Sequence, residues 1–287
     1  MELKKAIKWV IFWVTLSIIF NIGIYFTMGA DKALEYLGGY IIEESLSLDN
    51  LFLFLIIFKS FNIPPNYQRR VLNYGIIGAI ILRLIFISLG VSIVNKFSWI
   101  LYVFGFILIF SGIKMLSKKD EVPKDYSKSI VIRLISKIIP ITNTLEGEKF
   151  FVRKNNILNA TPLFAILFLI EGSDVIFAID SIPAIFSITT DPFIVYTSNI
   201  FAIMGLRSLY FVLVNMHESF RYVKQGVALI LTFTGIKLAV LIFDIHIPIV
   251  VSLMVIFSLL IGSIVMSIIM NKRDNNIKKP RKSNNIV

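Results

Sequence analysis

Long apolar stretches separated by short polar connections run along almost the whole chain. A helix of about 20 apolar residues is long enough to cross a bilayer. Eight stretches of this kind lie near residues 8–28, 35–58, 72–94, 98–117, 161–187, 193–215, 224–243 and 248–270. The pattern predicts an all-α integral membrane protein with about eight transmembrane helices.

Composition and charge agree with this prediction. The chain is 56% hydrophobic and 16% charged, with a mean hydropathy of +0.81. Most of its 29 Lys and Arg residues fall in connections on one side of the predicted membrane, whereas Lys32 and Lys96 fall on the other. Because basic residues mark cytoplasmic connections, both termini are predicted to be cytoplasmic. The net charge of +11 thus reports topology, and the predicted partner is the lipid bilayer, not nucleic acid.

The polar connections also suggest how the chain is divided. The first apolar stretch lacks a signal-peptide cleavage pattern and is predicted to be a retained helix. Residues 130–139 fit either a short amphipathic helix at the bilayer surface or an ordinary loop. The predicted units are an N-terminal helix (1–34), a first three-helix repeat (35–117), a basic cytoplasmic loop (118–160), a second repeat (161–243), a last helix (244–270) and a disordered basic tail (271–287).

Carboxylates inside the apolar stretches provide the strongest functional signal. Ionisable groups at membrane depth usually face a bundle interior and serve an ion or proton path. Two groups of polar residues occupy corresponding positions in the two halves, namely Glu43, Glu44, Asp49 and Asn50 in one and Glu171, Asp174, Asp180 and Ser181 in the other. The similarity of the two groups suggests that they contribute to one shared site.

The same order of motifs occurs twice. Each acidic segment precedes an arginine, Arg83 or Arg207, and then a Gly-Ile-Lys motif that ends at Lys114 or Lys237. Three spans per copy is an odd number, so the second copy enters the membrane from the opposite face. Such inverted-topology repeats are common in secondary transporters, whose sites lie near the midplane between the copies.

The acidic helices are predicted to be broken. Asp49 lies six residues after Glu43, which turns the two side chains to different sides of an ideal helix. Pro183 cannot donate a hydrogen bond to the carbonyl of Ile179, so a break near Asp180 is expected.

Oxygen-rich side chains suit hard divalent cations. The predicted metal-binding residues are Glu43, Glu44, Asp49, Asn50, Glu171, Asp174, Asp180 and Ser181, and Arg83, Lys114, Arg207 and Lys237 are predicted to gate the site or orient its ligands. With every group ionised, six carboxylates exceed these four basic side chains by two charges, which one divalent cation would neutralise. Raised carboxylate pKa values would instead suit a proton relay.

Several alternatives remain beside this interpretation. Asp49 could pair with Arg83, and Asp180 with Arg207, as purely structural ion pairs. The chain has no cysteine, and it has no hydrolase triad or phosphate-binding loop, so neither thiolate metal chemistry nor an enzyme is expected. No resident cofactor is predicted. A membrane scaffold in a stress or secretion complex is the rival function, and the oligomeric state is left open.

Several motifs resemble one known family. The segments 43–52, 68–72, 173–186, 190–195 and 197–203, continuing to Arg207, are similar to the TerC (tellurium-resistance, Alx-like) family of bacterial membrane proteins. The similarity covers about residues 35 to 270, and its most specific part is the long motif from Ser173 to Phe186.

The resemblance implies a transporter fold similar to the LysE-type exporters, in the bacterial plasma membrane. It also implies a role in divalent-metal homeostasis, chiefly Mn²⁺ efflux. From the ligand chemistry, Ca²⁺ is an alternative cargo and protons are the expected counter-ion. The acidic pattern of the family falls on Glu43, Asp49, Asn50, Asp174, Asp180 and Ser181, and less securely on Glu44. A carboxylate site without cysteine suits tellurite poorly, so that phenotype is expected to be indirect.

Overall fold

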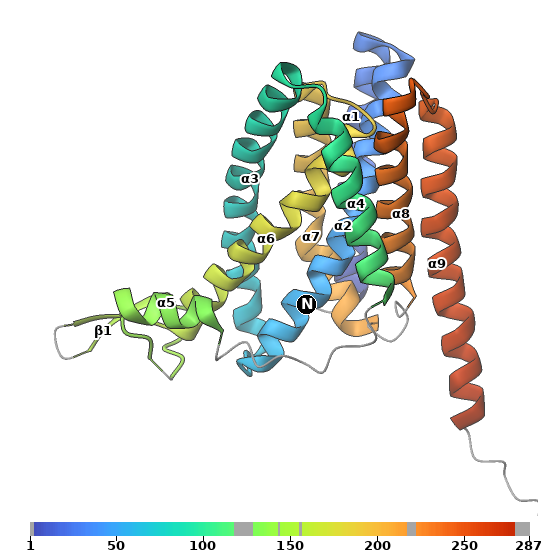
Figure 1. The fold of residues 1–287 in the computed structure, drawn as a ribbon. Helices are drawn as coiled ribbons and strands as arrows, with labels where there is room; N and C mark the ends of the chain where they lie inside the picture. The colour runs from blue at the N-terminus through green and yellow to red at the C-terminus, as the bar shows by residue number, and fades with distance from the viewer. Residues whose placement is uncertain (1–2, 118–128, 143, 155–156, 217–221, 279–287) are drawn as a thin grey trace, which may run out of the picture.

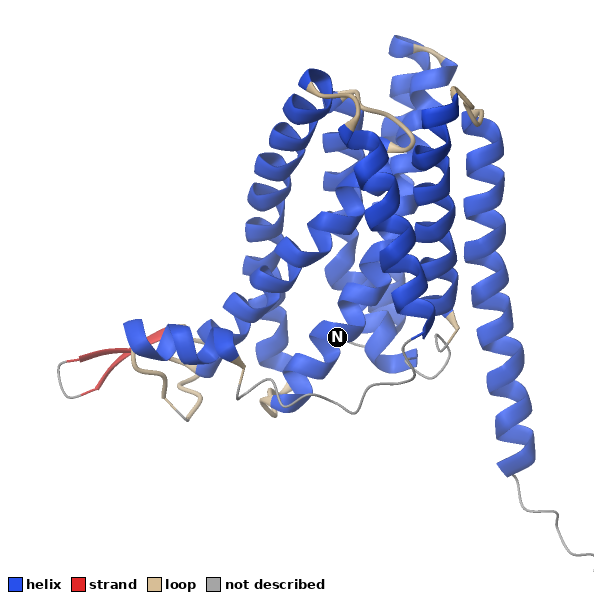
Figure 2. Cartoon of the chain, viewed as in Figure 1, coloured by secondary structure: helices blue, strands red, loops and turns tan. Residues whose placement is uncertain are grey.

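The computed structural model describes residues 3–117, 129–142, 144–154, 157–216 and 222–278. Eight long helices form a bundle, and a short helix and a two-stranded hairpin project from one end (Figures 1 and 2). The elements are α1 (Leu3–Met28), α2 (Ala30–Ser60), α3 (Pro65–Lys96), α4 (Ile100–Ser117), α5 (Ile130–Ile138), β1 (Phe151–Lys154), β2 (Ile157–Ala160), α6 (Pro162–Phe186), α7 (Pro192–Met216), α8 (Val223–Ala239), η3 (Val240–Phe243) and α9 (Ile249–Lys278).

The prediction of an all-α membrane protein is confirmed. Among the described residues, seven helices are long and apolar enough to cross a membrane, namely α1, α3, α4, α6, α7, α8 with η3, and α9. Helix α2 has the length, at 31 residues, but it carries Glu43, Glu44 and Asp49 near its middle. Because α2 lies inside the bundle, those carboxylates are kept from the surrounding lipid.

The predicted repeat units correspond to α2–α4 and α6–α8. Helices α2 and α6 run in opposite directions (Figure 1), as two inverted copies require. Helix α2 packs on α6 and α7, and α3 packs on the same two helices. The bundle interior is therefore shared between the two units, while the detailed correspondence of the copies stays a prediction.

The glycine of each Gly-Ile-Lys motif packs against the backbone of the other helix where α4 contacts α8. A Cβ atom added to Gly235 of α8 would lie 2.7 Å from both the Gly105 carbonyl oxygen and the Ile109 nitrogen of α4. One added to Gly112 would lie 2.7 Å from the Ala228 carbonyl oxygen. Glycine is required at these positions because the two backbones approach to this distance.

The buried core consists of two apolar clusters, one toward each end of the bundle. On α2 the first cluster ends at Leu48 and the second begins at Leu51, so Asp49 and Asn50 fall between them. Arg83, Glu171, Asp174 and Arg207 fall between the clusters in the same way on α3, α6 and α7. A polar layer thus crosses the middle of the bundle between two apolar layers.

The predicted helix breaks are wrong. Helices α2 and α6 are both continuous, and Pro183 lies in the last turn of α6. Pro183 still lacks the hydrogen bond to Ile179, but any bend that it causes affects only the three residues that follow it in the helix.

The predicted loop 118–160 is partly structured. Residues 130–138 form the helix α5 rather than an ordinary loop, while its placement at the bilayer surface stays a prediction, and β1 and β2 form a hairpin that was not predicted. Residues 118–128 lie outside the described part. Helix α9 continues to Lys278, so the start of the tail predicted to be disordered is helical, and residues 279–287 also lie outside the described part.

Candidate functional site: an oxygen cage around Arg83

Where the polar layer meets the first apolar cluster, one nitrogen atom of Arg83 is surrounded by oxygen atoms. Nη1 of Arg83, on α3, lies 2.6 Å from Oε2 of Glu43 and donates hydrogen bonds of 2.8 Å to Ser181 Oγ and Asn199 Oδ1. Ser47 donates to the other oxygen of Glu43 at 3.1 Å. Glu43 is fully buried and accepts from Ser47 on α2 and Arg83 on α3, while Ser181 on α6 and Asn199 on α7 accept from Arg83. We call the three oxygens around Nη1 the oxygen cage.

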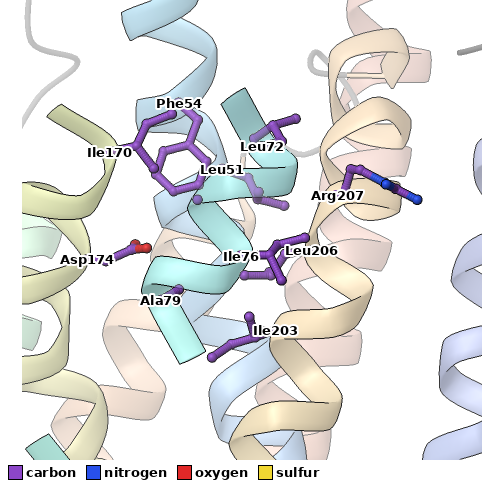
Figure 3. A pocket seen from close by; sticks show the side chains of 11 residues that line it. Leu51, Phe54, Leu72, Ile76, Ala79, Ile170, Asp174, Ile203, Leu206 and Arg207 are labelled. Atoms are coloured by element: carbon purple, nitrogen blue, oxygen red, sulfur yellow. The ribbon is translucent and has the colours of Figure 1, made fainter. Parts of the chain in front are cut away.

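Asp174 provides a second carboxylate beside this cage. It lies close enough to Arg83 and Glu43 to interact electrostatically with both. Its side chain lines a cavity of about 20 Å³ between α2, α3, α6 and α7. Figure 3 shows the carboxylate extending from α6 toward α3, whereas the guanidinium of Arg207 points away from it. A cavity of this size holds about one water-sized species.

Glu171 lies one helical turn before Asp174 and packs against the backbone of α3. Its carboxyl group occupies the space where a Cβ atom of residue 78 would lie, which only glycine leaves open. Oε2 of Glu171 is buried and has no hydrogen-bond partner. A buried carboxylate oxygen without a partner is costly, so it is available to a proton or a cation.

Glu44 faces a different part of the molecule from its neighbour Glu43. It accepts a hydrogen bond of 3.0 Å from Tyr40 and lines a separate cavity of about 180 Å³. That cavity is bounded by apolar residues of α1, α7 and α9, including Trp13 and Phe257. The structure therefore does not bring Glu44 to the oxygen cage.

Asp180 and Lys114 also lie apart from the cage. Asp180 accepts a hydrogen bond of 2.8 Å from Ser111 on α4, while its sequence neighbour Ser181 faces Arg83. Lys114 is exposed, with its nitrogen 5.8 Å from the centre of the Phe110 ring, and it acts electrostatically on Asp180.

The second arginine and lysine do not repeat the arrangement of the first. Arg207 donates a hydrogen bond to Asn73 of α3, so it does not pair with Asp180. Lys237 is only 8% exposed, and within the described ranges it has no hydrogen-bond or ion-pair partner. Arg83 pairs with Glu43, and a pairing of Arg83 with Asp49 stays a prediction.

The remaining two predicted residues, Asp49 and Asn50, lie in the polar layer on α2, where Asp49 is half-buried and Asn50 is buried. Among the residues that the structure describes, no group of three or more His, Cys, Asp or Glu side chains is arranged to hold a metal ion. Glu43, Asp174 and Ser181 therefore meet around Arg83, whereas Glu44 and Asp180 face other parts of the bundle.

Three residues of these hydrogen-bond networks were not predicted from the sequence. Asn199 and Ser47 complete the surroundings of Arg83 and Glu43, and Asn73 holds Arg207. The available signal was a polar side chain inside an apolar helix, which must find a partner at membrane depth.

Known proteins were compared with the chain. The family described as "Integral membrane protein TerC family" matches residues 28–275. A Salmonella typhi protein named "Putative membrane-bound redox modulator Alx" is 48% identical over 97% of this chain and 88% of its own length. The Escherichia coli K12 protein of the same name is 46% identical over 95% of this chain and 87% of its own length.

A Myxococcus xanthus relative, named an uncharacterized membrane protein, is 44% identical over 94% of this chain and 84% of its own length. No solved structure matches the chain. The match spans the acidic helices of both halves and every residue of the oxygen cage. This chain belongs to the TerC family of integral membrane proteins.

Proposed function

We propose that this protein is a secondary transporter that exports a divalent metal cation from the bacterial cytoplasm across the plasma membrane. Mn²⁺ is the favoured cargo, and protons are the counter-ion. The observation that carries the proposal is the oxygen cage, which combines carboxylate, amide and hydroxyl oxygens from both repeat units around one positively charged nitrogen. Hard cations of the Mg²⁺, Ca²⁺ and Mn²⁺ type select this set of ligands.

In this proposal, Arg83 occupies the cage in the absence of cargo. Its nitrogen stands where the cation would bind, and the distances of 2.6–2.8 Å are those of charge-assisted hydrogen bonds. Asp174 is close enough to this position to interact electrostatically with Arg83 and Glu43, and Glu171, one helical turn before Asp174, has a buried oxygen without a hydrogen-bond partner among the described residues. A cation that enters beside Asp174 would displace the guanidinium from Glu43 and take over its oxygen ligands.

Local charge supports a divalent cargo. When Glu43, Glu171 and Asp174 are all ionised, their three charges exceed that of Arg83 by two. Without a metal ion, protonation of two of these carboxyl groups would balance the charge of the site equally well, because buried carboxyl groups take up protons readily. The same residues can therefore alternate between a metal ion and protons, which is the requirement for exchange.

Transport into everted vesicles or proteoliposomes tests the proposal. We expect Glu43→Gln and Asp174→Asn to reduce proton-driven Mn²⁺ flux by at least about tenfold, because each removes a charged ligand. Asp31→Asn is the matched control, since Asp31 is an exposed carboxylate at the start of the same helix as Glu43. Wild-type protein with no flux of Mn²⁺ or Ca²⁺ would refute the proposal.

The rival function is a membrane scaffold whose buried charges are structural. The name of the relatives mentions redox modulation. This chain has no cysteine, so a redox effect through its own thiols is excluded. A scaffold would keep its partner proteins and show no flux, and Asp174→Asn would then change neither property.

A further inference from the structure

Helix α5 has three distinct faces. Ile135 is buried, and Ile132 packs against the same apolar cluster at this end of the bundle. At about 100° per residue, Leu134 and Ile138 fall on a second face, which is apolar yet 55% and 83% exposed. Arg133 and Lys137 are exposed on a third face. One apolar face holds the helix to the bundle, and the other is not covered by any part of the chain that the structure describes.

The β1–β2 hairpin extends this unpartnered apolar surface. Phe151, Arg153 and Leu158 share one face of the hairpin, because Arg153 pairs directly with Leu158. Phe151 contacts Phe164 at a ring-centre distance of 4.5 Å, and Phe164 contacts Phe168 at 5.2 Å. Phe168 is a 49% exposed residue on membrane-spanning α6, so its ring faces lipid. The row of rings connects the hairpin to the lipid-facing surface.

The position of these elements relative to the bundle is fixed. The guanidinium of Arg70, on α3, stacks over the Tyr74 and Phe150 rings and pairs with Glu148 at 3.3 Å. The backbone of Thr161, at the start of α6, donates to the Phe150 carbonyl. Figure 1 shows α5 and the hairpin extending sideways from the foot of α6, across the direction of the bundle helices.

We propose that α5 and the β1–β2 hairpin form a platform that lies in the membrane interface and binds anionic phospholipid headgroups. Leu134, Ile138, Phe151 and Leu158 enter the boundary between headgroups and acyl chains, as the apolar face of an interfacial helix does. Arg133, Lys137 and Arg153 then lie at headgroup level, where basic side chains attract anionic lipid.

The absence of cysteine allows a direct test of this placement. A fluorophore is attached to the full-length variants Ile138→Cys and Ser136→Cys, which change exposed positions on different faces of α5. In liposomes, we expect nitroxide-labelled lipid to quench the label at position 138 and aqueous iodide to quench the label at position 136. Strong quenching of both labels by iodide would overturn the proposal.

Lipid preference tests the charge component. With the label at position 138, nitroxide-labelled phosphatidylglycerol should quench more than nitroxide-labelled phosphatidylcholine. Removing Arg133, Lys137 and Arg153 together by Gln substitution should abolish this preference, at about fivefold in lipid affinity per side chain. Lys96→Gln, at an exposed site at the end of α3, should leave it unchanged. A preference that survives the triple substitution would show that these side chains do not recognise anionic lipid.

Discussion

Arg83 and Glu43 form an ion pair in which both side chains are almost entirely removed from solvent. Such a pair gains little over apolar packing, but the loss of one partner leaves an uncompensated charge that costs about 3–5 kcal/mol. A purely structural pair would be disturbed by a bound metal ion, whereas a cage occupied by Arg83 would accept the metal ion in its place. The two interpretations therefore differ in how an Arg83 variant responds to metal.

Arg83→Ala should lower the melting temperature of the purified protein because Glu43 loses its counter-charge. Mn²⁺ should restore part of that stability, since a cation could then enter the vacated cage. In Arg83→Ala/Glu43→Gln the stability should recover without metal, and added Mn²⁺ should have little effect. These melting temperatures can be measured in detergent. Equal shifts by Mn²⁺ in both variants would argue against the cage as a cation site.

At the residue scale, the sequence identified the right residue types more reliably than their partners. Glu43, Asp174, Ser181 and Arg83 were all predicted, because charged or polar groups in apolar helices are conspicuous. The ion pair of Arg83 with Glu43 was not predicted, since six residues turn a helix by about 240° and the side of α2 that faces α3 is set by packing. Asn199 was missed because it carries no charge.

At the scale of the elements, the helices can be predicted from the lengths of the apolar stretches, but the contacts between helices depend on how their surfaces fit together. All eight long helices were predicted, because an apolar segment of this length in lipid must satisfy its backbone hydrogen bonds internally, as a helix does. The hairpin was not predicted, because its two four-residue strands lie within a polar connection. The recurrence of Gly-Ile-Lys was recognised as a repeat, although its physical basis, the close approach of α4 and α8, requires both backbones to be placed.

Gly235→Ala should destabilise the protein, because the added methyl group would meet the α4 backbone at 2.7 Å. Such overpacking typically costs about 1–3 kcal/mol. Gly262→Ala is the matched control, since Gly262 lies in helix α9 with nothing within 4 Å of its added Cβ. That variant should be neutral or slightly more stable, owing to the better helix propensity of alanine. Thermal unfolding measures both, and a harmless Gly235→Ala would contradict the close α4–α8 contact.

On the scale of the whole molecule, the polar layer is enclosed by apolar clusters, and a polar network ties the repeat units together at the end where α2 begins. Lys32 contacts Glu35 and Asp191 at 2.9 Å each, and Thr189 donates to Glu35 at 2.6 Å. Asp191 also caps α7 through the Phe193 backbone N–H. The network connects the first turn of α2 to the α6–α7 turn, and alternating access would require these two segments to separate.

Protonation of Asp191 should weaken this connection. Burial alone would raise the pKa of its carboxyl group, but the hydrogen bonds from Lys32 and the Ile194 backbone outweigh burial and hold the pKa below the usual 3.8. A lowered folded-state pKa adds stability above the unfolded-state pKa, and that stability is lost as the pH falls through the folded-state pKa. The contribution of the network is therefore complete at neutral pH and disappears in acid below about pH 4.

Asp191→Asn isolates this charge, because asparagine caps a helix about as well as aspartate. At about pH 7 the variant should melt roughly 1–3 °C below the wild type, as expected for a partly exposed ion pair. In acid below the lowered folded-state pKa of Asp191, the two melting temperatures should converge, since the wild-type carboxyl group is then protonated as well. If Lys32 and Asp191 act as a pair, adding Lys32→Gln to Asp191→Asn should lower the melting temperature little further. Asp31→Asn changes an exposed residue in the first turn of α2, so this variant should melt like the wild type at both pH values. A difference for Asp191→Asn that persists unchanged in acid would mean that the amide disturbs packing and that the ion pair does not hold these segments together.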